Sequence, residues 1–387
     1  MYEALQQYFA EMNIKKVVIY GYKQQRHTHY WVQSAFYRAF SYLRDSGIPF
    51  ELSWEDNRSL LRAADLENAL VIGNLNVGQV DFALPLTDKA YYLIHNHAPK
   101  RFAARRYRAL KDAGRCITFE VFRGKVYDET HLPIEGEPCH ALSVPQSNAV
   151  LTWGTDLLPD EIEQNRAKVI ETGRHPRENR RVVFVGSIWR VNKEALSEVI
   201  DYCTGNGLKF AQYGGYVIDN FRSAPHPDVS FKKEYVDIDT NADLVREAYI
   251  APAIQGKSQL ANSESVGNYV PCRVFKNISY GNLGVTNNAT ANALFDNRLI
   301  YHPEIPELMK LAETRLKDAN ADETLLNLMD EVKAKHTYIN RIETLLHALD
   351  TCRRAKGGAP RVELTPHLSN AARRSAAAVA KLFTSEK

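Results

Sequence analysis

The stretch YVPCRVFKNISYGNLGVTNN, from Tyr269 to Asn288, decides how the chain is interpreted. It predicts a short helix that ends at Gly281, followed by a tight turn into a short apolar strand. Arg273 and Lys276 lie three residues apart and therefore on one face of that helix. Backbone N–H groups and two cations near a helix start suit a diphosphate. The alternative is a buried helix whose Arg and Lys side chains extend to solvent.

The composition sets limits on domain number and class. With 387 residues the chain is too long for one ordinary core, which predicts two domains. Hydrophobic residues make up 44% and charged residues 25%, the balance of a soluble globular protein. The net charge of +3 produces no global field that would favour nucleic acid. Five scattered cysteines without a CxxC pair indicate a reducing compartment and argue against a zinc site.

Both ends of the sequence bear on location. Residues 1–12 predict an amphipathic helix rather than a signal peptide. Apolar runs stay well short of the roughly 18 residues that cross a bilayer, so we expect a cytoplasmic protein. Residues 369–383 predict a basic, Ala-rich helix that is solvated or docked, with at most a peripheral contact to a membrane as the alternative.

The first half of the chain alternates strands and helices. A strand at 15–21, a helix at 31–44 with apolar residues at the 3.6-residue period, and a strand at 50–52 form a βαβ opening. Such a unit predicts a parallel sheet. Further strands are expected at 69–73, 90–94, 117–122 and 149–151. We therefore predict an α/β domain over residues 1–165.

The pattern restarts after a polar stretch at 160–181. A strand at 181–187 ends at Gly186, a helix follows at 192–204, and another strand begins at 208–210. These elements predict a second Rossmann-like domain over 180–350 and a tail over 351–387. Two such parallel-sheet domains that face each other form a cleft, and ligands are expected at the carboxyl ends of the strands.

Three motifs stand out in the second half: Gly186-Ser187 with the nearby Arg190, the stretch CRVFKNISYGNLGVTNN, and KHTYINR at 335–341. Together they resemble the GT-B glycosyltransferases, and most closely the spore-maturation CgeB-like group. The resemblance spans roughly residues 181–349. It implies a GT-B fold and the transfer of a sugar from a nucleotide-diphosphate donor, held by the second half, without a metal. The acceptor would be a glycan or a lipid-linked sugar held by the first half, as in polysaccharide biosynthesis.

One position departs from this family. Lys276 stands where many members have Glu, and an ammonium group cannot accept hydrogen bonds from sugar hydroxyls. It could instead neutralise the departing diphosphate. The spacing R-x-x-K-N at 273–277 resembles the K-x-x-R-N helix of GDP-fucose-dependent fucosyltransferases, which invert. The departure therefore favours inversion and makes a GDP-sugar one option, while the donor stays open.

Several residues are predicted to bind the donor. Arg273 and Lys276 would stabilise charge on the leaving diphosphate, supported by Arg190 and by backbone N–H groups near Gly186. The base and ribose need a slot, for which residues 213–216 and 249–253 are candidates, and a plain turn is the alternative at 213–216. The predicted donor-binding residues are Gly186, Ser187, Arg190, Tyr213, Gly214, Arg273, Lys276 and Asn277.

An inverting enzyme also needs a general base for the acceptor hydroxyl. Candidates follow predicted strands of the first half: His27 or His29, Asp56, and His95 or His97. A structural loop histidine is the alternative at each position. A metal on His95 and His97 lacks a third ligand in the sequence, and the letters DID at 237–239 predict a solvated loop rather than a Mn²⁺ site. We therefore expect no metal and no cofactor.

Two other functions share these features. The first is a nucleotide-sugar epimerase or hydrolase of the same fold, which would release nucleotide without an acceptor. The second is a non-catalytic subunit that binds a nucleotide or carbohydrate. Such a subunit has no turnover, so replacing Arg273 or Lys276 could not abolish any.

Overall fold

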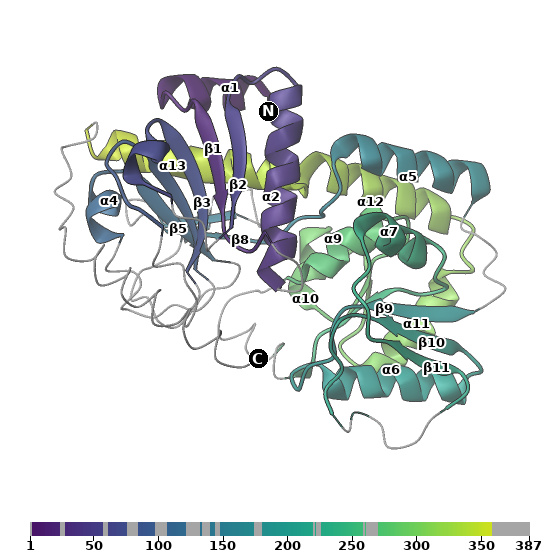
Figure 1. Cartoon of the computed structure of the whole chain (residues 1–387). Helices are drawn as coiled ribbons and strands as arrows, with labels where there is room; N and C mark the ends of the chain where they lie inside the picture. Colours follow the sequence, from purple (N-terminus) through teal and green to yellow (C-terminus); the bar gives the residue numbers. More distant parts are fainter. Residues whose placement is uncertain are drawn as a thin grey trace. The chain divides into compact units, whose positions relative to one another are not determined.

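The computed structural model describes residues 2–23, 28–56, 61–75, 84–96, 107–120, 132–133, 140–143, 148–173, 180–219, 221, 226–257, 260 and 270–357. The chain forms two compact units, one of residues 1–151 and 339–387, the other of residues 152–338 (Figure 1). The predicted α/β class is confirmed, because a parallel sheet is present in each unit.

The first unit contains the N-terminal elements and the last long helix. Its helices are α1 (Tyr2–Glu11), α2 (Thr28–Asp45), the 3-10 turn η1 (Ala63–Leu66), α4 (Arg108–Asp112) and α13 (Tyr338–Ala355), of which Tyr338 belongs to the second unit. Its strands are β1 (Lys16–Tyr20), β2 (Glu51–Glu55), β3 (Ala69–Leu75), β4 (Tyr91–Asn96), β5 (Cys116–Glu120), β6 (Leu132–Pro133), β7 (His140–Ser143) and β8 (Asn148–Leu151).

These strands form one sheet in the order β2-β1-β3-β4-β5-β8-β7-β6. The strands β2, β1, β3, β4, β5 and β8 are parallel, as the βαβ opening predicts. At one edge of the sheet, β7 pairs antiparallel with β8, and β6 pairs antiparallel with β7. The central strands are buried because Val17, Val18, Leu70, Val71 and Leu93 have no exposed surface. A sheet buried on both faces is typical of parallel strands covered by helices.

The second unit repeats the alternation of helices and strands. Its helices are α5 (Pro159–Thr172), α6 (Lys193–Gly205), α7 (Ile238–Arg246), α9 (Cys272–Ser279), α10 (Ala289–Leu294), α11 (Ile305–Arg315) and α12 (Ala321–Lys335). Its strands are β9 (Arg181–Val185), β10 (Lys209–Tyr213), β11 (Val229–Lys232), β12 (Pro252–Ala253), β13 (Val285–Thr286) and β14 (Ile300–Tyr301).

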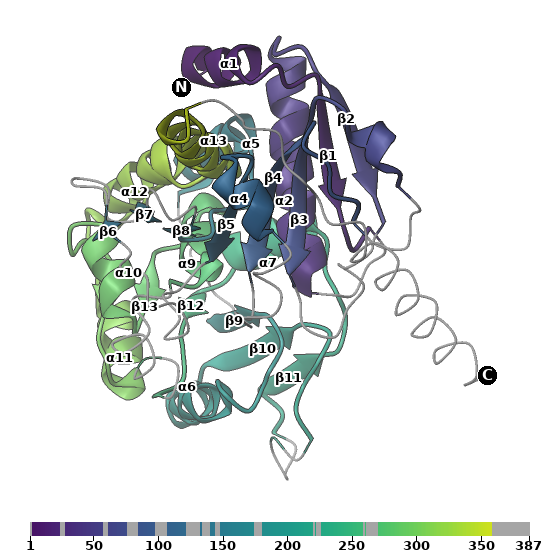
Figure 2. The ribbon, with the colours of Figure 1, turned by 90° about the vertical axis from the view of Figure 1, so that its left-hand side faces the viewer.

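The six strands described in this unit follow the doubly wound order. Strands β11-β10-β9 and β12-β13-β14 form two parallel groups, and Ile250, just before β12, joins them by pairing with Val182 of β9. The backbone bonds are Tyr249 N–H to Arg181 O, 2.8 Å, and Val183 N–H to Ile250 O, 2.9 Å. Figure 2 shows β9, β10 and β11 side by side with α6 along them. The order reverses between β9 and β12, and ligands bind at such reversals in open α/β sheets.

Helix α9 forms as its sequence predicts. Val274, Phe275 and Ile278 bury its apolar face. The helix ends because Gly281 has φ +97°, a conformation that favours glycine, and its N–H reaches back to Ile278 O over 3.0 Å. Strand β13 follows, so the predicted helix, turn and strand are confirmed.

The units begin and end at other residues than the predicted 165, 180 and 350. Helix α5 belongs to the second unit, where the Asn165 side chain donates to Ser279 O of α9 over 3.3 Å. Most of α13 belongs to the first unit, where Arg354 contacts Glu11 of α1 over 2.6 Å. Residues 358–387, which hold the predicted Ala-rich helix, lie outside the described part. Among the described helices, none is both long and apolar enough to cross a bilayer.

Residues 237–239 begin a helix rather than form the expected solvated loop. Asp237 is the N-cap of α7, and its carboxylate accepts a hydrogen bond from Thr240 N–H over 2.7 Å. This bond lowers the pKa of Asp237. A carboxylate in that position satisfies a backbone donor at the helix start. Asp237 therefore has a structural role.

Candidate functional site

The loop after β9 is fixed against the end of β10. Gly186 directly follows β9 and has φ +150°, which favours glycine. Its N–H donates to Tyr213 O over 2.7 Å, and its carbonyl accepts from the Gln212 side chain over 2.7 Å. A Cβ on Gly214 would lie 2.5 Å from Gly186 carbonyl atoms, so the two loops touch. The structure thus brings Gly186, Tyr213 and Gly214 together.

Arg273 joins this group from the start of α9. Its Nε donates to Val185 O, the last carbonyl of β9, over 3.0 Å. Its guanidinium lies over the Phe184 ring, 4.1 Å from the ring centre. A Cβ on Gly186 would overlap this guanidinium. A half-buried positive group therefore stands at the carboxyl end of β9, beside the point where the strand order reverses.

Lys276 and Asn277 have partners within the second unit. Lys276 Nζ lies 2.6 Å from Asp156 Oδ2, and the Tyr280 hydroxyl donates to Asp156 Oδ1 over 2.6 Å. Burial lowers the pKa of Lys276, but the Asp156 carboxylate and a hydrogen bond to it raise the pKa further, so the net shift is upward. Asn277 donates to Ala251 O over 2.6 Å. Arg273 and Lys276 thus have different protein partners, and the donor contacts of Lys276 and Asn277 stay predictions.

An exposed aromatic pair lies next to Gly186 and Gly214 in the sequence. The rings of Trp189 and Tyr216 stack at 4.3 Å, with exposed fractions of 50% and 36%. The two loops are held in register because Ile188 N–H donates to Tyr216 O over 2.9 Å. Stacked rings with an open face suit a base or a sugar ring.

The remaining donor-binding candidates differ in their surroundings. Arg190 is exposed, and the Ser187 carbonyl accepts from the Asn192 side chain over 3.2 Å. Residues 249–253, the other predicted slot, pair with β9, and Tyr249 bonds to Arg181 at the amino end of that strand. Tyr249 is therefore at the opposite end from Gly186 and Arg273, but the segment runs parallel to β9, so its later residues lie toward the end that holds them.

The late motif KHTYINR has a packing role in the second unit. His336 is 2% exposed, and its ring lies 4.7 Å from that of Phe275 on α9 and 5.3 Å from that of Phe295. Its carbonyl accepts from Thr155 N–H over 2.9 Å. This residue therefore packs against α9. Asp156, which follows Thr155, had no local signal in the sequence.

The candidate bases belong to the first unit. His95 lies on β4 and is 4% exposed, with its ring 5.4 Å from that of Phe119. Asp56 follows β2 and is half-buried. The side chain of His29, and residues His27 and His97, lie outside the described part. Within the described ranges, no group of three His, Cys, Asp or Glu is placed to hold a metal ion.

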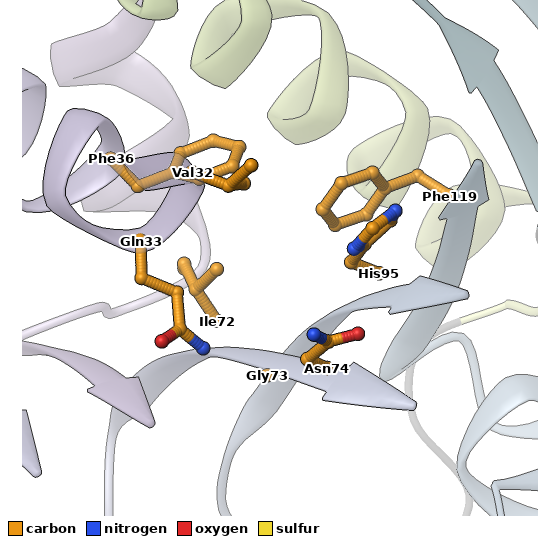
Figure 3. A pocket seen from close by; sticks show the side chains of 8 residues that line it. All are labelled: Val32, Gln33, Phe36, Ile72, Gly73, Asn74, His95 and Phe119. Carbon is orange, nitrogen blue, oxygen red and sulfur yellow. The ribbon is translucent and has the colours of Figure 1, made fainter. Parts of the chain in front are cut away.

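A cavity lies beside His95, between α2 and the carboxyl ends of β3, β4 and β5 (Figure 3). Its lining residues are Val32, Gln33, Phe36, Ile72, Gly73, Asn74, His95 and Phe119. The volume open to the centre of a water-sized group is about 10 Å³, which is room for one such group.

No protein-family model matches the chain, and no curated protein does either. Among solved structures, it is similar to AviGT4, a glycosyltransferase involved in avilamycin A biosynthesis, with 14% identity and a TM-score of 0.49 over 89% of this chain and 99% of that chain. It is also similar to the α,α-trehalose-phosphate synthase (UDP-forming) from Burkholderia vietnamiensis, with 10% identity, a TM-score of 0.40, and 86% and 79% coverage. A third is the catalytic domain of starch synthase IV from Arabidopsis thaliana bound to ADP and acarbose, with 10% identity, a TM-score of 0.39, and 84% and 79% coverage. Because these TM-scores lie below 0.5, the function proposed below depends on the motifs, strand order and side chains of this chain.

Proposed function

We propose that the chain is a GT-B-type glycosyltransferase that binds a nucleotide-diphosphate sugar on its second unit. The observation that carries this proposal is the position of Arg273, which is tied to the end of β9 where the strand order reverses from β9 to β12. A fixed guanidinium at this place suits a diphosphate, because its planar fork matches phosphate oxygens.

Arg273 would act on the leaving group. As the bond from sugar to diphosphate breaks, negative charge grows on the diphosphate, and a cation already in place stabilises that charge without reorganisation. Arg190, on the exposed loop after β9, can add a second cation. The Gly186 N–H is already bonded to Tyr213 O, so it would not contribute to the diphosphate site. The open faces of Trp189 and Tyr216 would receive the base.

Lys276 would act on this site through its position in α9. Its ammonium is compensated by Asp156, so the pair would hold the start of the helix, and thus Arg273, in place. This assignment makes Lys276 a positioning residue, while Arg273 makes the direct contact.

The chemistry would be transfer to a glycan or lipid-linked hydroxyl without a metal, with inversion and with His95, Asp56 or His29 as the base. A GDP-sugar, as in fucosyltransferases, is one donor option, and polysaccharide biosynthesis is a fitting context. These features rest on the resemblance of the motifs and on the chemistry of His and Asp near neutral pH.

Isothermal titration with UDP-, GDP- and dTDP-sugars tests the proposal. We expect one of the three to bind to the full chain and Arg273→Ala to weaken that binding at least tenfold, about 1.4 kcal/mol. Arg180→Ala is the matched control, because Arg180 pairs with Glu313 and lies before the amino end of β9. If none of the donors binds, or if both variants bind like the wild type, the proposal is wrong.

Turnover then separates the proposed transferase from its alternatives. A transferase releases nucleotide faster when an acceptor is added, whereas a hydrolase or epimerase acts on the donor alone. Donor binding without turnover of any kind, over a panel of glycan acceptors, would indicate a non-catalytic binding subunit.

A further inference from the structure

Three polar side chains, Gln33, Asn74 and His95, interrupt the otherwise apolar lining of the cavity beneath α2. Asn74 on β3 pairs in register with His95 on β4, which pairs with Phe119 on β5. Residues in register on neighbouring parallel strands point to the same face of the sheet. Ile72, two residues before Asn74 on β3, points to the same face of the sheet. This face is therefore apolar at Ile72 and becomes polar at Asn74 and His95, at the carboxyl ends of β3 and β4.

The Asn74 amide is buried and has no hydrogen-bond partner among the residues that the structure describes. Asn74 is 4% exposed, and neither its Nδ2 nor its Oδ1 has a partner in the structure as described. Gln33 on α2 is 3% exposed, and its Nε2 donates to Tyr20 O over 3.0 Å, but its Oε1 has no partner among the described residues. Figure 3 shows Gln33 at one side of the cavity and Asn74 at the other, beside the rings of His95 and Phe119. Buried amides are nearly always bonded, so three such atoms around one cavity point to a ligand.

Asn165 is a buried amide in which both ends are bonded within the protein, whereas among the described residues Asn74 has a partner at neither end. Asn165 is 6% exposed, its Nδ2 donates to Ser279 O over 3.3 Å, and its Oδ1 accepts from Arg246 over 3.1 Å. Both ends of that amide are therefore used within the protein. The difference makes Asn74 a candidate for recognition rather than for folding.

The donors and acceptors around the cavity define the ligand group. One amide NH2 group and two carbonyl oxygens are offered, and a hydroxyl can accept from the first while donating to one of the others. A carboxylate or phosphate cannot donate to those carbonyl oxygens. The volume of about 10 Å³ admits one group of water size, so a single hydroxyl would enter while the rest of its molecule stays outside.

We propose that Asn74 and Gln33 bind a hydroxyl group of a polyhydroxyl ligand, a sugar, at the carboxyl ends of β3 and β4. The site lies where ligands bind in open parallel sheets, beside the helix that follows β1. The identification of the ligand as a sugar rests on the proposed function, in which the sugar would be the acceptor. The prediction that Asn74 and Gln33 bind a hydroxyl group does not depend on that function.

Saturation-transfer NMR on the full chain tests this site with free glucose, galactose, mannose, fucose and N-acetylglucosamine as probes. We expect at least one of them to bind, and Asn74→Leu and Asn74→Ala each to weaken it at least tenfold. Melting temperatures give a second readout. Because Asn74 has no partner to lose within the described part of the chain, Asn74→Leu should melt at or above the wild-type temperature, whereas Asn165→Leu should melt lower.

Three results would overturn the proposal. The first is that no probe sugar binds to the wild type, and the second is that the Asn74 variants bind as the wild type does. The third is that Asn74→Leu and Asn165→Leu lower the melting temperature alike, which would show that the Asn74 amide is satisfied in the folded protein. Titration of UDP and GDP on the same samples separates the two proposals. If a sugar binds but neither nucleotide does, the proposed glycosyltransferase function is wrong, whereas the proposed sugar site in the cavity is supported.

Discussion

Lys276 and Asp156 form an ion pair with 2.6 Å between Nζ and Oδ2, although 120 residues separate them in the sequence. The side chains are 18% and 5% exposed, and the second carboxylate oxygen accepts from the Tyr280 hydroxyl. Asp156 lies just before α5, and Lys276 and Tyr280 lie on and just after α9. The carboxylate therefore connects the segment that enters the second unit to the helix that presents Arg273.

Replacing Lys276 should destabilise the second unit. Lys276→Met leaves the Asp156 carboxylate buried without its counter-ion, so we expect the free energy of unfolding to fall by about 3 kcal/mol. Lys310→Met is the matched control, because Lys310 is 73% exposed and 4.0 Å from its partner, and should change stability by less than about 0.5 kcal/mol. Urea unfolding followed by tryptophan fluorescence measures both. Equal effects of the two variants would contradict a structural role for the pair.

The same pair predicts a dependence on alkaline pH. The pKa of Lys276 is raised in the folded chain, so its stabilising contribution is present below the unfolded lysine pKa of about 10.4 and is lost as pH rises through the folded value. The difference in melting temperature between wild type and Lys276→Met should therefore stay constant from pH 7 to about pH 10 and shrink above it. A difference that persists unchanged at the highest pH at which the chain folds would show that the charge is not what stabilises it.

Local patterns predicted the architecture well because they follow from periodicity and turn chemistry. The βαβ opening, the helix that ends at Gly281 and the restart at β9 each depend on residues close together in the sequence. The strand order of the second unit follows in part from the same signals, since alternating strands and helices produce a parallel sheet. The antiparallel strands β6 and β7 were not predicted, because β6 has only two residues and shows no alternation.

The site was harder to predict because its contacts are long-range. Spacing placed Arg273 and Lys276 on one helix face, but only the fold shows that Asp156 is the partner of Lys276 and Val185 that of Arg273. Asn74 was missed for a similar reason. An Asn at the end of an apolar strand resembles a turn residue, and its register beside His95 becomes visible only when β3 and β4 pair.

Gly186 offers a direct test of how Arg273 is placed. Gly186→Ala introduces a Cβ that overlaps the Arg273 guanidinium, in a backbone conformation that alanine rarely adopts. We expect at least a tenfold loss of affinity for the nucleotide-sugar donor, together with a loss of about 1 kcal/mol or more in stability. Titration calorimetry and thermal unfolding of the same samples provide the two measurements.

Gly205→Ala is the matched control for that change. Gly205 is the last residue of α6, and a Cβ there meets no atom within 4 Å. The variant should bind the donor like the wild type and be slightly more stable, by about 0.5 kcal/mol, because alanine favours helix. Donor affinity that falls equally in both variants, or in neither, would show that the fit between Gly186 and Arg273 does not control binding.

Cys272 should report ligand binding at the start of α9. It is half-buried and precedes Arg273, whereas Cys116, Cys203 and Cys352 are buried. Burial raises the pKa of the Cys116 and Cys203 thiols to about 12, so both should stay protonated and unreactive at pH 8. We expect iodoacetamide to modify Cys272 before these three, and a bound nucleoside diphosphate to slow that reaction several-fold, with each site read from its own peptide by mass spectrometry. Arg273→Ala should remove the protection without removing the reaction. If saturating UDP, GDP and dTDP all leave the rate at Cys272 unchanged, the diphosphate does not bind beside Arg273.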